Sequence, residues 1–138
     1  MIAGTGSGCG KTTVTLAVLR AMQRRNIPLA AFKCGPDYID PMFHKAVLGI
    51  PSRNLDLFFV SEREVRGQIV RSIPQNGIGV IEGVMGFYDG VSGTTDTASA
   101  AHLARCVIFL IFVQYQSCFQ QHLQADPVCN SNPLIHLR

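Results

Sequence analysis

The stretch Gly4-Thr5-Gly6-Ser7-Gly8-Cys9-Gly10-Lys11-Thr12-Thr13 stands almost at the start of this 138-residue chain and decides its fold. A glycine-rich turn that ends in Gly-Lys-Thr-Thr between a strand and a helix surrounds an anion with backbone N–H groups, a positive helix end and a lysine. The stretch therefore predicts a phosphate-binding loop, in which Lys11 reaches the β and γ phosphates and the Thr12 hydroxyl binds Mg²⁺. The residues predicted to bind the nucleotide are Gly6, Ser7, Gly8, Cys9, Gly10, Lys11, Thr12 and Thr13.

The spacing of this loop departs from the usual pattern G-x-x-x-x-G-K-[ST], which requires a glycine at position 5, where this chain has Thr5. The loop is similar to the expanded loops in the branch of P-loop proteins that includes dethiobiotin synthetase and the partitioning ATPases. The departure thus indicates a subfamily of nucleotide-binding proteins. The alternative is that this segment is only a glycine-rich turn before an ordinary helix and binds no phosphate.

Strands and helices are predicted to alternate after the loop. Apolar residues at helical spacing and capping signals predict helices over 11–26, 42–48, 61–73 and 96–105, and compact apolar runs predict strands over 1–3, 29–33, 78–82 and 107–113. Because parallel strands need crossover connections, we expect an α/β fold with a three-layer, P-loop NTPase-like parallel sheet flanked by helices. Residues 1–113 are expected to form a partial P-loop ATP-binding domain, and residues 114–138 an atypical, poorly structured tail.

The composition excludes several classes of protein. With 47% hydrophobic and 15% charged residues and a net charge of +3, the chain has neither the profile of a disordered protein nor that of a polybasic nucleic-acid binder. Its longest apolar run, 107–113, is far shorter than the roughly 20 residues of a membrane-spanning helix. The five cysteines form no CxxC pair. We therefore expect a cytoplasmic protein with reduced thiols that binds neither nucleic acid nor a membrane.

Charged side chains lie at the ends of two predicted strands. Lys33 ends one strand and Asp37 follows it, while Glu82 ends the next and Asp89 comes soon after. Because the carboxyl ends of neighbouring parallel strands meet at one crevice, these groups are predicted to meet the phosphates. Glu82 is then a Mg²⁺ ligand or a water-orienting acid, and Lys33 neutralises the transferring phosphate. The alternatives are that Glu82 is only a solvated glutamate at a strand end and that Lys33 is only an exposed surface lysine.

The segments 4–13, 32–44, 52–56 and 82–90 together resemble the nucleotide-binding half of the cobyrinic acid a,c-diamide synthase family, over residues 2–105. The resemblance implies ATP- and glutamine-dependent amidation of the a and c carboxylates of cobyrinic or hydrogenobyrinic acid in cobalamin biosynthesis, through an acyl phosphate. A related nickel-sirohydrochlorin reaction stays open. Together with the loop chemistry, it implies catalytic roles for Lys11, Lys33, Asp37, Glu82 and Asp89, substrate contacts by Asp37, Tyr38 and Ile39, and a metal site at Thr12 and Glu82.

Members of that family continue with a further substrate region and a glutaminase domain, neither of which is recognised in this sequence. The resemblance therefore predicts that this chain is truncated and by itself cannot use glutamine. The ammonia would come from a glutaminase domain that is missing here. Whether the chain forms a homodimer stays open.

Three other interpretations remain. A partitioning-type ATPase would carry an additional lysine near the start of the loop, where this chain has Gly6. A dethiobiotin-synthetase-like ligase shares the loop but matches the segment after Lys33 less well. A non-functional truncated product is the third. His44 and His102 show no partner at ligand spacing and are expected to be surface residues or hydrogen-bonded structural ones.

Overall fold

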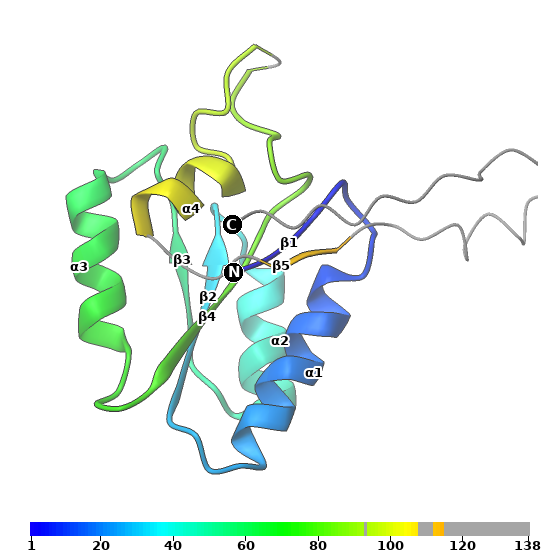
Figure 1. Ribbon diagram of the computed structural model, residues 1–138, viewed down its shortest axis with the longest axis vertical. Helices are drawn as coiled ribbons and strands as arrows, with labels where there is room; N and C mark the ends of the chain where they lie inside the picture. The colour runs from blue at the N-terminus through cyan, green and yellow to red at the C-terminus, as the bar shows by residue number, and fades with distance from the viewer. Residues whose placement is uncertain (93, 108–111, 115–138) are drawn as a thin grey trace, which may run out of the picture.

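The computed structural model describes residues 1–92, 94–107 and 112–114, and it shows a parallel sheet with helices on both faces (Figure 1). The strands are β1 (Ile2–Gly4), β2 (Leu29–Cys34), β3 (Ser52–Leu55), β4 (Ile78–Glu82) and β5 (Phe112–Gln114). The helices are α1 (Lys11–Gln23), α2 (Ile39–Leu48), α3 (Glu62–Ser72) and α4 (Ala100–Val107). The strand order is β3-β2-β4-β1-β5, and each neighbouring pair is parallel. The expected three-layer α/β fold of the P-loop type is confirmed.

The central strands β2 and β4 are buried on both faces, and their side chains alternate between two cores. Phe32 packs in the core under α3 and α4, whereas Ala31 packs in the core under α1 and α2. Lys33 is the next residue on the face of Ala31, and it is the register partner of Glu82 on β4. The register therefore puts an ammonium group and a carboxylate side by side, under α1 and α2, where both strands end.

The structure adds one strand and extends one helix relative to the expectations. β3 pairs only with β2 among the described strands, and its Ser-Arg-Asn-Leu sequence lacks the apolar run by which the other strands were predicted. Helix α2 begins at Ile39, before the predicted start at residue 42, and contains Pro41 in its first turn. Proline is tolerated there because the first turn has no intrahelical acceptor for its missing N–H.

The end of the described chain also differs from the expectations. Helix α4 begins at Ala100 instead of residue 96 and includes Val107, so the predicted strand 107–113 was wrong at its start. Phe112–Gln114 form β5 next to β1. The remainder of the predicted tail, 115–138, lies outside the described residues.

The predicted capping box at the start of α3 is confirmed. The Ser61 hydroxyl accepts the Glu64 N–H, and the Glu64 carboxylate accepts the Ser61 N–H at 2.8 Å. Both bonds satisfy backbone donors that have no partner inside the helix.

Replacing Ser61 by alanine is expected to lower the free energy of unfolding by about 1 kcal/mol, because the α3 cap is lost. Urea denaturation measures this change. Ser72→Ala, at the last residue of the same helix, is the matched control and should change stability by a few tenths of a kcal/mol at most. Equal effects of the two substitutions would contradict the assignment of the cap.

No helix in the described part of the chain has the length and apolar character needed to cross a membrane.

Candidate functional site

The glycine-rich loop folds back over the end of β1 before α1 begins. A Cβ atom on Gly4 would lie only 2.3 Å from Cys9 Sγ, so this close approach requires a glycine. Gly10 is the N-cap of α1, with φ of 87°, a left-handed conformation that favours glycine. No side chain caps this helix start, so its first N–H groups face the loop with the positive end of the helix dipole.

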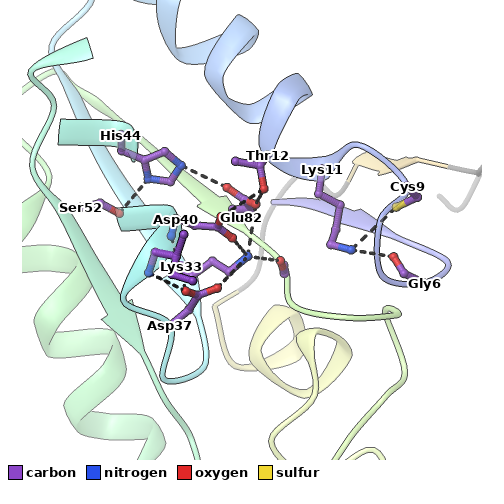
Figure 2. Close-up of polar contacts among 12 residues, drawn as sticks. Gly6, Cys9, Lys11, Thr12, Lys33, Asp37, Asp40, His44, Ser52 and Glu82 are labelled. Atoms are coloured by element: carbon purple, nitrogen blue, oxygen red, sulfur yellow. Dashed lines mark hydrogen bonds and ion pairs between the residues drawn. The ribbon is translucent and has the colours of Figure 1, made fainter. Parts of the chain in front are cut away.

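Lys11 lies inside this loop. Its ammonium group donates to the Gly6 carbonyl at 2.7 Å and lies 3.7 Å from Cys9 Sγ (Figure 2). These contacts hold the ammonium group above the same turn that presents the helix N-terminus. The loop therefore combines backbone donors, a helix dipole and a cation around one point, which is the chemistry of a phosphate cradle.

A second group of charges surrounds Lys33, which is only 3% exposed. Its Nζ lies 2.5 Å from Asp40 Oδ2, 3.2 Å from Glu82 Oε1 and 3.8 Å from Asp37 Oδ2. It also donates to the Gly83 carbonyl at 3.0 Å. The side chains come from β2, β4, the start of α2 and the turn before α2, and they converge on one ammonium group (Figure 2).

Thr12 joins the loop to this charged group. Its hydroxyl donates to Glu82 Oε1 at 2.6 Å and lies 3.4 Å from Asp40 Oδ1. A pocket of about 370 Å³ covers both parts of the site. Its lining residues are Ser7, Gly8, Gly10, Lys11, Thr12, Thr13, Lys33, Asp37, Asp40, Glu82, Val84 and Met85.

The buried partners keep both central groups charged at neutral pH. Burial alone would lower the pKa of Lys33, but its hydrogen bond to Asp40 and the charge of Glu82 leave that pKa raised. Burial alone would raise the pKa of Glu82, but hydrogen bonds from His44 and Thr12 and the charge of Lys33 leave that pKa lowered. The site therefore contains an ammonium group and a carboxylate that stay ionised away from solvent.

The donor set suits a magnesium ion next to a polyphosphate. A hydroxyl from Thr12 and carboxylates from Glu82 and Asp40 are hard oxygen ligands of the kind that Mg²⁺ prefers. Asp37, Asp40 and Glu82 outnumber Lys11 and Lys33, so a divalent cation between these carboxylates and the phosphates would reduce their mutual repulsion. The residues present therefore fit Mg²⁺ together with a nucleotide.

Two of these groups were not among the candidates from the sequence. Asp40 is the carboxylate nearest to the Lys33 ammonium, and His44 is fully buried against Glu82. Both lie on α2, four residues apart, on the face that also buries Leu48. The i, i+4 spacing of Asp40, His44 and Leu48 would have found them if the helix had been started at Ile39.

The structure places the other candidate residues at the margin of the pocket or outside it. Asp37 lines the pocket, and its Oδ1 also accepts the Ile39 N–H at 2.8 Å. Tyr38 and Ile39 are 79% and 67% exposed beside it. Asp89 instead accepts the Gly86 N–H at 2.7 Å, within its own loop, and does not line the pocket.

The described residues contain another group of potential metal ligands, on the opposite face of the sheet. Glu62, His102 and Cys106 each place one ligand atom within 4.8 Å of the others. However, His102 Nδ1 accepts the Ala98 N–H, so the proton of the neutral ring lies on Nε2, 3.4 Å from Glu62 Oε1. A histidine that binds a metal through Nε2 commonly carries its proton on Nδ1 and donates it to a neighbouring acceptor. His102 has the opposite arrangement. This group is therefore a hydrogen-bonded contact between α3 and α4.

Cys34, at the end of β2, is predicted to be inert in the folded chain. Burial raises the pKa of its thiol to about 12, so hardly any reactive thiolate exists at pH 8. We expect iodoacetamide to label Cys34 at least about 100-fold more slowly in the folded chain than in urea. Mass spectrometry of the Cys34 peptide measures both rates, and equal rates would contradict this burial.

Comparison with known proteins agrees with this geometry. Residues 1–117 match the model of the CobQ/CobB/MinD/ParA nucleotide binding domain. The chain is 45% identical over 114 residues to the cobyrinate a,c-diamide synthase of Salmonella typhimurium, which covers 80% of this chain and 25% of that protein. It is 50% identical over 106 residues to the enzyme of the same name from Clostridium acetobutylicum, which covers 76% of this chain and 23% of that protein.

The chain spans about a quarter of the length of the curated relatives that it matches. No solved structure matches it. The phosphate cradle lies inside the matched region, and the expected resemblance is confirmed. The chain belongs to the CobQ/CobB/MinD/ParA nucleotide-binding domain family, as a member similar to the cobyrinate a,c-diamide synthases.

Proposed function

We propose that this chain is the nucleotide-binding part of an amidoligase that uses MgATP to activate carboxylates of a corrinoid acid. The observation that carries the proposal is the sharing of one pocket by the phosphate cradle and the buried Lys33–Glu82 pair. A nucleotide-binding loop alone would serve many functions. The neighbouring buried cation and carboxylates add the means to stabilise charge as a phosphoryl group moves.

In this proposal the residues of the pocket have separate roles around the β and γ phosphates. The loop N–H groups and Lys11 hold the β and γ phosphates. Thr12 and Glu82, which are hydrogen-bonded to each other next to Asp40, would hold Mg²⁺. Bound there, the ion would withdraw charge from the phosphate oxygens. In this proposal Lys33, which lines the same pocket, neutralises the phosphoryl group during transfer.

The proposed chemistry explains why an ATP site belongs in an amidating enzyme. A carboxylate is a poor acyl donor, so its oxygen first attacks the γ phosphorus, the bond to the bridging oxygen breaks, and ADP leaves. Ammonia then attacks the acyl carbon of the acyl phosphate, and inorganic phosphate leaves. In this proposal a glutaminase region provides the ammonia from glutamine.

The name of the relatives supports the choice of substrate. They are called cobyrinate a,c-diamide synthases, and we extend that substrate class, a corrinoid acid, to this chain. Tyr38 and Ile39 are exposed beside Asp37 at the edge of the pocket. A large, partly apolar tetrapyrrole would contact such side chains as its carboxylate reaches the nucleotide.

Hydroxylamine trapping tests the proposal without glutamine. The chain is incubated with MgATP, cobyrinic acid and hydroxylamine, which converts an acyl phosphate into a stable hydroxamate. We expect corrinoid hydroxamate and ADP in equal amounts by mass spectrometry, and neither product above background in Lys33→Met. ATP hydrolysis that does not depend on the corrinoid would contradict the proposal and favour a nucleotide-switched ATPase.

A further inference from the structure

His44 occupies a buried position between one side chain of β3 and one of β4, behind the proposed metal ligands. It is fully buried on α2, with Nε2 3.1 Å from Glu82 Oε2 and Nδ1 3.0 Å from Ser52 Oγ. Figure 2 shows the imidazole ring between these two side chains, on the side of Glu82 away from Lys11. Each ring nitrogen therefore has one side-chain partner.

The two oxygens of Glu82 have different partners. Oε1 accepts hydrogen bonds from Thr12 and Lys33, both of which line the pocket. Oε2 is contacted by His44. A terminal carboxylate torsion has a broad energy minimum, so the carboxylate keeps one orientation only if its neighbours fix both oxygens.

The hydrogen-bond network assigns the tautomer of His44. An ionised carboxylate can only accept, so Nε2 carries a proton that it donates to Glu82. In the neutral ring Nδ1 is then an acceptor, and the Ser52 hydroxyl donates to it. Glu82 thus selects the tautomer, and the Ser52 hydroxyl on β3, which can donate or accept, completes the hydrogen bonds of the ring.

We propose that His44 is a positioning residue that holds Oε2 of Glu82, so that only Oε1 faces Thr12 and the phosphate pocket. The proposal rests on the proposed function, in which Glu82 serves Mg²⁺ beside the nucleotide. Residues that orient metal ligands in this manner commonly change metal affinity by 10- to 100-fold when they are replaced. The role of His44 is therefore measurable in the magnesium dependence of nucleotide binding.

Two amide variants separate the contact with Glu82 from the mere filling of a buried polar site. In His44→Gln the side-chain amide nitrogen can reach the place of Nε2 and donate to Glu82. In His44→Asn the amide reaches only as far as Nδ1, next to Ser52. Both variants are polar and uncharged, so they differ chiefly in this one hydrogen bond.

Calorimetry of ATP binding to the full 138-residue chain, with Mg²⁺ and with EDTA, is the first measurement. In His44→Asn we expect the affinity gained from Mg²⁺ to fall by about tenfold or more, with the affinity in EDTA unchanged. His44→Gln should keep most of the gain. An undiminished gain in His44→Asn, or equal losses in the two variants, would overturn the proposal.

A spectrum of the nucleotide-free chain tests the contact if a variant fails to fold. ¹⁵N spectra of the wild-type chain report the tautomer of each imidazole, and the signals of His44 are those that persist when His102, His122 and His136 are each replaced by glutamine. We expect a proton on Nε2, and a neutral ring with its proton on Nδ1 alone would overturn the proposal. If the wild-type chain bound no ATP with Mg²⁺ or with EDTA, the proposed function would be wrong. A proton on Nε2 would still support the hydrogen bond from His44 to Glu82 Oε2.

Discussion

MgATP at about 100 times its dissociation constant is expected to raise the unfolding midpoint of the wild-type chain by about 8 °C, and Lys11→Ala should abolish most of that rise. A ligand at this concentration that binds only the folded state adds about 2.7 kcal/mol, and each kcal/mol moves the midpoint of a domain of this length by about 3 °C. Lys11 is the one loop side chain whose charge lies inside the cradle. Differential scanning calorimetry with and without MgATP measures the effect.

The matched control for this experiment is Lys45→Ala. Lys45 lies on the exposed surface of α2 and outside the pocket, so its loss removes the same charge without touching the nucleotide. We expect the full midpoint shift in Lys45→Ala. A shift that survives in Lys11→Ala would contradict the assignment of the loop as the nucleotide site.

Lys33→Met is expected to lower the free energy of unfolding by about 3–5 kcal/mol, the usual effect of breaking a buried ion pair from one side. The substitution removes the only ammonium group within 4.0 Å of Glu82 among the described residues, and it leaves Asp40 without its ion-pair partner. Removing the second charge as well, in Lys33→Met with Glu82→Gln, should recover part of the loss. Urea denaturation of both variants and of the Lys45→Met control measures these changes.

The pH dependence provides a separate test of the same charges. The lowered pKa of Glu82 contributes stability that is present above the unfolded-state pKa and is lost as the pH falls through the folded-state value. The raised pKa of Lys33 contributes stability that is lost only as the pH rises through that raised value. In Lys33→Met the unpaired carboxylates can take up protons, so its deficit relative to wild type should shrink in acid. A constant deficit between pH 7 and pH 4 would contradict the burial of these charges.

The sequence was sufficient for the parts of the site that depend on strand order and loop chemistry. The Gly-Lys-Thr-Thr ending predicted the loop and α1. The apolar runs that end in Lys33 and Glu82 predicted two strands, and parallel pairing then required their last side chains to meet. The loop was predictable from the spacing of neighbouring residues. The meeting of Lys33 and Glu82 was predictable from the rule that parallel strands end at the same edge of a sheet.

The features that the sequence did not reveal depend on tertiary contacts. β3 has a polar sequence and becomes a strand because β2 offers an open edge, which no local pattern of β3 reveals. The predicted helix began at residue 42, after Pro41, and this later start hid the shared face of Asp40 and His44. Asp89 follows Glu82 closely in sequence, but the direction of the loop between them is set by its own hydrogen bonds.

The pairing of Lys33 with Glu82 also protects the chain against misfolding. If β4 paired with β2 one residue out of step, every β4 side chain would exchange faces, and Glu82 would turn toward the apolar side that holds Phe32 and Leu103. A buried carboxylate without a cation there would cost several kcal/mol, whereas an apolar residue at position 82 would allow the slip at little cost. Single-residue insertions or deletions within β4 should therefore be among the least tolerated changes in this protein, because they would disrupt assembly of the sheet and the chemistry of the pocket in one step.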